Sequence, residues 1–170
     1  MLFHSVTFDL DGTLLDTIAD LAEACRLMLA EIGEPPRTQA EVHTFVGKGM
    51  AVLVERCLTH DEPPTAEALH EAIESFKRHY AAVNGKLTQI YPGVLDGLKA
   101  WKRAGLKMGV VTNKPGMFTE ALLERMGIAD QIKSNLRQVP SGVRVGSIIT
   151  SGEAEIGFQQ ISELLHAPGV

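Results

Sequence analysis

Apolar residues along the chain fall into two short continuous runs and several longer stretches with helical spacing. The first run, Leu2 to Leu10, is rich in Phe and Val and leads into a Gly-containing loop, which predicts a short buried strand. A second run, Leu106 to Thr112, has the same character and predicts another strand. Elsewhere apolar residues recur at spacings of three and four, which predicts helices. These helices are expected over residues 15–32, 41–58, 65–83, 94–104 and 118–126.

Helix-starting and helix-stopping residues support these boundaries. Gly33, with Pro35 and Pro36 just beyond it, ends the first helix. Thr65 is a good N-cap for the helix that follows it, and Gly127 closes the last one.

Strands that alternate with helices predict an α/β fold with a parallel sheet, in which the active groups gather at the carboxyl ends of the strands. The stretch between the two strands is too long for a simple crossover. We therefore expect a sheet core formed by residues 1–16 and 88–130, with residues 17–87 inserted as a helical cap.

Composition and charge narrow the class of protein. Of 170 residues, 45% are hydrophobic and 22% are charged, which is typical of a globular domain. The net charge of −5 argues against a general nucleic-acid binder. No apolar stretch approaches the ~20 residues needed to cross a bilayer, and the first residues do not resemble a secretory signal, so we expect a soluble cytoplasmic protein. Cys25 and Cys57 are expected to be reduced core thiols.

Two aspartates follow the first predicted strand. Asp9 stands at its end, where an ionised carboxylate can point into the crevice and attack phosphorus. Asp11 is well placed to protonate the leaving alkoxide and then to activate water against the resulting aspartyl phosphate. Mg²⁺ would neutralise the repulsion between the carboxylate and the phosphate by bridging them. Gly12 lets the backbone turn tightly so that amides reach the phosphate. The alternative is an ordinary Asp-rich turn after an edge strand.

Polar residues also follow the second predicted strand. Thr112 and Asn113 would donate hydrogen bonds to the same phosphoryl oxygens and stabilise charge as it develops. Taken alone, this pair is equally typical of a turn or a helix cap.

These motifs resemble those of a known family. Residues 9–13 (DLDGT) are similar to the first motif of the haloacid dehalogenase superfamily of phosphohydrolases, and residues 111–115 (VTNKP) to its second. Residues 45–50 (FVGKGM) and 91–94 (YPGV) resemble phosphoglycolate phosphatases in particular. The resemblance covers about residues 1–129.

The resemblance implies a Rossmann-like core with an inserted helical cap and hydrolysis of 2-phosphoglycolate, a small phosphorylated metabolite. It implies Asp9 as nucleophile and Asp11 as acid/base, with Mg²⁺ held by the Asp9 carboxylate and the Asp11 carbonyl oxygen. Lys48 would meet a substrate carboxylate, although a solvated surface lysine is an equally good interpretation. The residues expected to bind substrate are Gly12, Thr13, Thr112, Asn113, Lys114 and Lys48.

The pattern of the family breaks after the second motif. Its later lysine and its acidic Gly-Asp-x-x-x-Asp loop are not recognisable in residues 131–170. Residues 152–160 instead resemble a stretch of molybdate-type periplasmic solute-binding proteins. The simplest account is a chimeric or frame-altered reading frame, with the core truncated. In a second interpretation, Glu153 or Glu155 would reach the metal while Lys133 or Lys114 approached the phosphate.

Three hypotheses remain open at this point. The first is a Mg²⁺-dependent phosphomonoester hydrolase. The second is a catalytically inactive chimeric or truncated fragment that at most binds Mg²⁺ and phosphate. The third is an oxyanion-binding module formed by residues 131–170. The sequence leaves the oligomeric state open.

Overall fold

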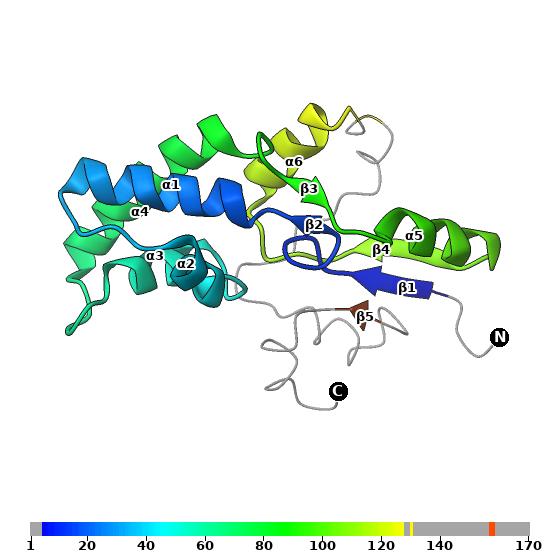
Figure 1. Ribbon diagram of the computed structural model, residues 1–170, viewed down its shortest axis with the longest axis horizontal. Coiled ribbons are helices and arrows are strands. Elements are labelled where there is room, and N and C mark those ends of the chain that lie inside the picture. Colours follow the sequence, from blue (N-terminus) through cyan, green and yellow to red (C-terminus); the bar gives the residue numbers. More distant parts are fainter. Residues whose placement is uncertain (1–4, 128–129, 131–156, 159–170) are drawn as a thin grey trace. The chain divides into compact units, whose positions relative to one another are not determined.

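The computed structural model describes residues 5–127, 130 and 157–158 (Figure 1). These residues belong to two compact units. The sheet unit contains residues 5–16, 89–113 and 157–158, and the helical unit contains residues 17–88, 114–127 and 130.

A parallel sheet forms the sheet unit. Strand β1 (Ser5–Phe8) lies between β4 (Lys107–Val110) and β5 (Gly157–Phe158), and both pairings are parallel (Figure 1). Phe8 is in register with Val110, so β1 and β4 end side by side. The two strands expected from the apolar runs are therefore confirmed, and so is the α/β class with a parallel sheet.

Helix α5 (Val94–Arg103) covers the apolar face of this sheet. Val6 and Phe8 point to one face because they lie two residues apart on β1, and both are buried. Leu98 and Trp101 of α5 pack against them. This small core fixes the carboxyl ends of β1 and β4 as a common edge.

A second, two-stranded pairing corrects the predicted start of the first helix. Residues Leu15–Asp16 form β2, which pairs antiparallel with β3 (Gln89–Ile90), and α1 begins only at Ile18. Leu15 cannot join the helix because its amide donates to the Leu10 carbonyl and its partner in the sheet is Ile90. The sequence analysis also did not predict β3.

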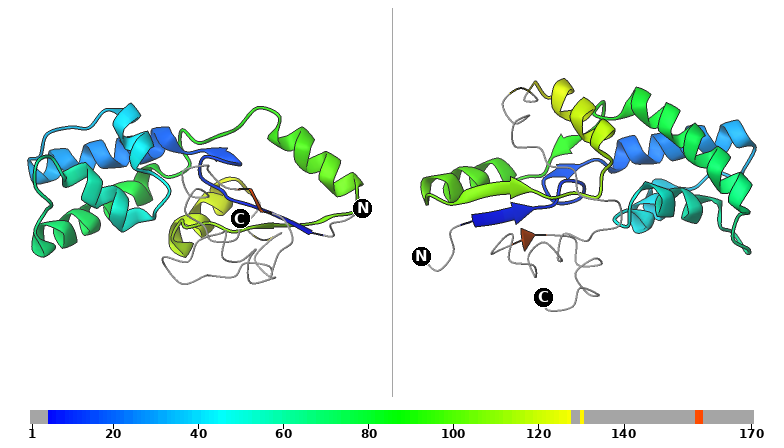
Figure 2. Two further views of the ribbon diagram at one scale, coloured as in Figure 1. Left: turned by 90° about the horizontal axis from the view of Figure 1, so that it is seen from below. Right: turned by 180° about the vertical axis from the view of Figure 1, so that it is seen from behind.

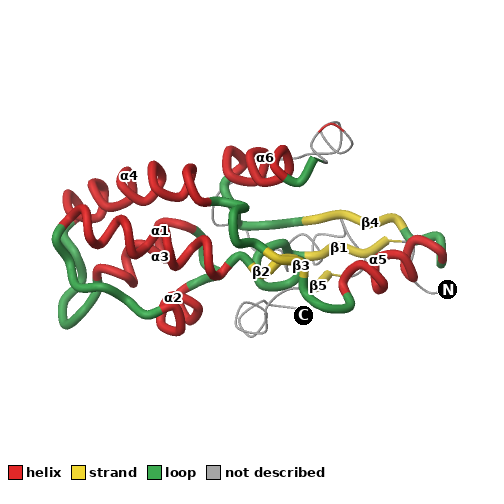
Figure 3. Tube along the Cα trace, turned by 45° about the horizontal axis from the view of Figure 1, so that its top comes forward, coloured by secondary structure: helices red, strands yellow, loops and turns green. Residues whose placement is uncertain are grey.

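Five helices in the described residues build the helical unit. Helix α1 (Ile18–Ile32) lies along α4 (Ala66–Val83) in both views of Figure 2, and both contact α3 (Met50–Leu58). Helices α2 (Gln39–Phe45) and α6 (Gly116–Arg125) complete the unit (Figure 3). The apolar faces meet in one core, where Cys25 and Cys57 are buried as free thiols, as expected. Its largest fully buried apolar side chains include Tyr80, Phe76, Phe118, Met28 and Leu29.

The single helix predicted over residues 41–58 is wrong. The structure has two helices there, α2 and α3, separated by residues 46–49. Gly47 and Gly49 have φ values of 120° and 89°, a conformation that side-chain-bearing residues rarely adopt and that a helix cannot contain. The apolar spacing on both sides of this loop concealed the break.

Capping residues are confirmed elsewhere. The Thr65 hydroxyl accepts a hydrogen bond from the Ala68 amide at the start of α4. Gly33 ends α1 in the left-handed conformation, and its amide donates to the Leu29 carbonyl. Among the described residues, no helix combines the length and apolar character needed to cross a membrane.

The expectations for residues 131–170 lie outside the described residues, apart from 157–158. This applies to Lys133, Glu153 and Glu155 and to the resemblance to solute-binding proteins.

Candidate functional site

The candidate nucleophile stands directly after β1. Asp9 is buried, with 5% of its surface exposed, and its Oδ1 accepts a hydrogen bond of 2.8 Å from the Leu10 amide. The strand thus delivers a carboxylate to the carboxyl edge of the sheet, where one of its oxygens is held by the backbone.

A tight turn follows Asp9. The Leu10 carbonyl accepts hydrogen bonds from the amides of Thr13, Leu14 and Leu15 at 3.4, 3.1 and 3.0 Å. Gly12 adopts a φ of 79° within this turn, and its amide donates to the Leu15 carbonyl at 2.8 Å. A residue with a side chain would be strained at this position, so the glycine is required by the turn.

Asp11 is fixed by the same turn. It forms an isolated β-bridge with Leu15, which is itself the first residue of β2. Asp11 is partly buried, whereas Gly12 is exposed. The turn therefore presents a second carboxylate two residues after the first, on a backbone held by several hydrogen bonds.

The neighbouring strand brings the second motif to the same edge. The Val111 amide donates to the Phe8 carbonyl at 2.8 Å, so the chain leaves β4 directly beside the end of β1. Thr112 and Asn113 follow and are partly buried. A hydroxyl and an amide from one strand and two carboxylates from the next can surround a tetrahedral anion and a cation bound to it.

The donors at this edge suit a hard divalent cation. The described residues contain no group of three or more His, Cys, Asp and Glu side chains arranged to hold a metal ion. Asp9 and Asp11 offer oxygen ligands. Mg²⁺ is commonly held by one or two carboxylates together with waters and substrate phosphate oxygens, so these residues fit it.

Lys48 lies in the helical unit. It is exposed, and it stands between Gly47 and Gly49 in the loop that joins α2 to α3. Arg56 of α3 donates to the carbonyls of Thr44 and Phe45, both at 3.4 Å, and so ties the start of this loop to the helix that follows it.

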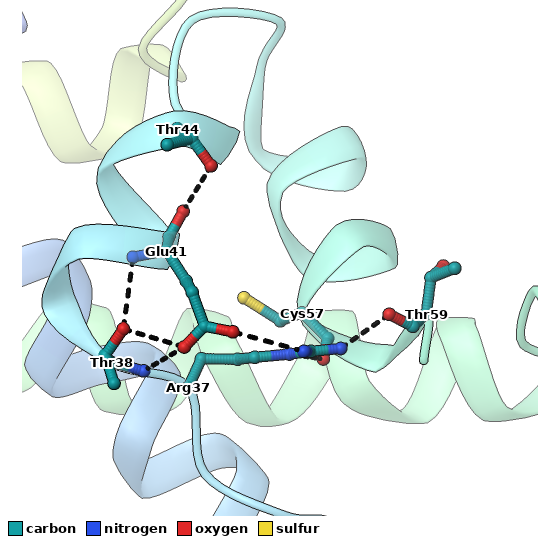
Figure 4. Close-up of polar contacts among 6 residues, drawn as sticks. All are labelled: Arg37, Thr38, Glu41, Thr44, Cys57 and Thr59. Carbon is teal, nitrogen blue, oxygen red and sulfur yellow. Dashed lines mark hydrogen bonds and ion pairs between the residues drawn. The ribbon is translucent and has the colours of Figure 1, made fainter. Parts of the chain in front are cut away.

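A polar cluster centred on Arg37 holds α2 and α3 together (Figure 4). Its guanidinium donates to the carbonyls of Cys57, in the last turn of α3, and Thr59, its C-cap residue, at 3.0 and 2.5 Å. It also forms an ion pair of 3.4 Å with Glu41. Thr38 and Glu41 form a capping box at the start of α2, and the Thr38 hydroxyl holds the pKa of Glu41 below its usual value. This cluster fixes the two helices that carry the Lys48 loop.

Lys114 also lies in the helical unit and is buried. Its Nζ donates to the Tyr80 hydroxyl and lies 4.8 Å from the centroid of the Tyr80 ring. The ring packs edge-on against Phe118, with centroids 4.9 Å apart. The ammonium group is therefore positioned by α4.

The sequence analysis missed Asp20. This residue, in the first turn of α1, is fully buried, and its carboxylate accepts hydrogen bonds from the segment 85–88. Its only sequence signal is an acidic residue near the start of a helix, which ordinarily indicates no more than a favourable charge there.

Comparisons with known proteins identify the family to which the chain is similar. Residues 6–138 match the family model described as haloacid dehalogenase-like hydrolase. A phosphoglycolate phosphatase of Thiobacillus denitrificans is 41% identical over 128 residues, which is 74% of this chain and 56% of that protein. Phosphoglycolate phosphatase 1 of Pseudomonas aeruginosa is 43% identical over 128 residues, or 71% of this chain and 45% of that protein.

Solved structures show the same likeness. The crystal structure of a predicted phosphoglycolate phosphatase from Haemophilus somnus superposes with a TM-score of 0.72 at 25% identity, covering 93% of this chain and 76% of that one. The chain spans about half the length of the curated relatives it matches.

Proposed function

Because this chain belongs to the haloacid dehalogenase-like hydrolase family, we propose that it is a Mg²⁺-dependent phosphatase that hydrolyses 2-phosphoglycolate through an aspartyl phosphate on Asp9. The observation that carries the proposal is the position of Asp9 at the end of β1, beside the Thr112–Asn113 turn at the end of β4. Relatives named phosphoglycolate phosphatase support the choice of substrate. Two buried free thiols fit a reducing, cytoplasmic compartment.

Asp9 would attack phosphorus through the carboxylate oxygen that is not held by the Leu10 amide. As the new bond between oxygen and phosphorus forms, the ester bond to the glycolate oxygen breaks. Asp11 would give its proton to that leaving oxygen and then take one from the water that attacks the aspartyl phosphate, which regenerates Asp9 and releases inorganic phosphate.

Thr112 and Asn113 would bind the phosphoryl oxygens. The Gly12 and Thr13 amides donate within the turn after Asp9, so Thr13 would contribute through its hydroxyl and Gly12 through the conformation of the turn. The Asp9 carboxylate and the Asp11 carbonyl oxygen would hold Mg²⁺, which when bound would neutralise the charge of the phosphate. Lys114 and Lys48 are proposed as further substrate contacts, Lys48 for the carboxylate of phosphoglycolate. The Tyr80 contact supports a fixed position for Lys114.

The test is release of inorganic phosphate from 2-phosphoglycolate with and without Mg²⁺. Asp9→Asn removes the nucleophile while keeping the size of the side chain, and should abolish turnover. Asp96→Asn changes an exposed aspartate in the first turn of α5 of the same unit and should leave turnover unchanged. Equal turnover by wild type and Asp9→Asn would refute the proposal.

One observation favours a second candidate, an inactive fragment that binds Mg²⁺ and phosphate. The chain spans 45% to 56% of the curated relatives above, and the later motifs of the family are not recognisable in it. Calorimetric titration with beryllium fluoride and Mg²⁺ separates the two. Binding that depends on Asp9, without turnover by the wild type, would establish the second candidate in place of the first.

A further inference from the structure

We propose that Asp20 is a positioning residue for Asp11, acting through segment 85–88 and the β2–β3 pair. The inference rests on the proposed function, in which Asp11 transfers the proton. Asp20 itself belongs to the helical unit and takes no part in the chemistry.

The carboxylate of Asp20 joins the first turn of α1 to segment 85–88 by hydrogen bonds. Its Oδ2 accepts hydrogen bonds from the amides of Gly85 and Thr88 at 2.9 and 3.0 Å, and from the Thr88 hydroxyl at 2.6 Å. Its Oδ1 accepts one from the Leu87 amide at 2.9 Å. A buried charge is costly unless it is fully hydrogen-bonded, and four donors meet that condition here.

These bonds hold the chain where it passes between the two units. The chain crosses from the sheet unit into the helical unit between Asp16 and Thr17, and it returns between Thr88 and Gln89. Asp20 lies three residues beyond the first crossing, and Thr88 is the last residue before the second. The Asp20–Thr88 hydrogen bonds therefore link the segment that enters the helical unit to the segment that leaves it.

The same two segments are joined again within the sheet unit. Asp16 pairs with Gln89 and Leu15 with Ile90 in the β2–β3 pair. Leu15 is also the bridge partner of Asp11, and its carbonyl accepts the Gly12 amide. A continuous series of hydrogen bonds and peptide bonds thus runs from the Asp20 carboxylate to the turn that carries Asp11.

A two-stranded pair this short is marginally stable by itself. The pair β2–β3 has two residues on each strand, so it needs its ends held together by another contact. The four hydrogen bonds that Asp20 accepts from residues 85–88, here called the Asp20 clamp, supply that contact at one end of the pair. Without it, the β2–β3 pair loosens and the Asp11 turn loses a fixed partner.

A kinetic comparison of two esters tests this assignment. Glycolate is a poor leaving group that needs a proton from the general acid, whereas p-nitrophenolate leaves readily without one. In Asp20→Ala, kcat/KM, which reports the steps up to cleavage of the ester bond, should fall roughly tenfold more for 2-phosphoglycolate than for p-nitrophenyl phosphate, as expected for a misplaced general acid. Simple loss of folded enzyme would lower both rates by the same factor, and that result would overturn the proposal.

Three further variants extend the comparison of the two esters. In Asp20→Asn, the side-chain carbonyl oxygen can accept at most two of the three bonds that Oδ2 accepts, and the NH2 group faces the Leu87 amide, so this variant should restore only part of the wild-type ratio between the two esters. Glu23→Ala changes a partly exposed acidic residue of the same helix and should leave the ratio unchanged. If Asp20→Ala does not fold, Thr88→Val removes one donor and should shift the ratio in the same direction.

Amide hydrogen exchange tests, independently of activity, whether Asp20 holds the turn that carries Asp11. Loss of the clamp should speed exchange at Gly12 and Leu15 as well as at Leu87 and Thr88, and leave the amides of β1 protected. Faster exchange confined to residues 85–88 would overturn the positioning role. If the wild type hydrolyses neither ester, only the proposed function is refuted. The exchange measurement still reports whether Asp20 holds the Asp11 turn.

Discussion

Replacement of Arg37 by alanine should destabilise the helical unit much more than the loss of an ordinary surface arginine. Arg37 donates to two carbonyls at the C-terminal end of α3, that of Cys57 in the last turn and that of Thr59, the C-cap residue (Figure 4). Carbonyls at a helix end have no partner within the helix, and the positive charge there also interacts favourably with the helix dipole.

The size of the effect follows from these contacts. A hydrogen bond to a charged group contributes about 1.5–3 kcal/mol to stability, so two give about 3–6 kcal/mol. The Arg37 side chain is 14% exposed, and water can reach the end of α3 once the side chain is removed. Freed side-chain entropy offsets as much as ~2 kcal/mol. We expect Arg37→Ala to lower the free energy of unfolding by about 1–4 kcal/mol.

Urea unfolding followed by circular dichroism at 222 nm measures this change, because helices dominate that signal. Arg26→Ala is the matched control: the Arg26 side chain is 54% exposed and forms an i,i+3 ion pair with Glu23, so its loss should cost about 0.5 kcal/mol or less. Arg37→Lys keeps the charge but lacks the fork that reaches both carbonyls, and should restore less than half of the loss. If Arg37→Ala and Arg26→Ala shift the unfolding midpoint equally, the reasoning is refuted.

Two other substitutions probe the backbone and the pH dependence of stability. Gly85→Ala should lower the free energy of unfolding by about 1–3 kcal/mol, since φ is +85° and the new Cβ would lie 2.9 Å from Leu122. Gly97 lies in α5, and a Cβ there would have open space around it. Gly97→Ala should therefore raise the free energy of unfolding by about 0.5–1 kcal/mol in the same urea titration. Hydrogen bonds, first that from His79, hold the pKa of Glu31 below its ordinary 4.5. Above pH 4.5 the wild type should therefore have a higher unfolding midpoint than Glu31→Gln, and this difference should vanish as the pH falls below 4.5. A difference that does not change with pH would exclude this contribution.

Local patterns in the sequence were sufficient for much of this molecule. The run of apolar residues up to Leu10 and the glycine after Asp11 predict a strand followed by a tight turn, and both are present. They depend on neighbours within a few residues, so the sequence carries the necessary information. The family resemblance over the same residues is confirmed by the match to residues 6–138.

Local patterns also misled at two places. Apolar spacing on either side of Gly47 and Gly49 indicated one helix, although the positive φ values of these glycines divide it. At the start of α1, helical spacing included Leu15, which belongs instead to a strand. The competing partner there is Ile90, which lies far along the chain, and hydrophobic spacing contains no information on such pairings.

Short-range periodicity and chain stereochemistry are sufficient to predict the two parallel strands, most helices, and the aspartates and polar residues that follow the strands. The partners of Asp20, Arg37 and Lys114, in contrast, depend on the packing of distant elements. The Asp20 carboxylate meets the Gly85 amide across 65 residues of sequence. Such a contact exists only after α1 and α4 have packed, because buried charges take whichever donors the completed core brings within reach.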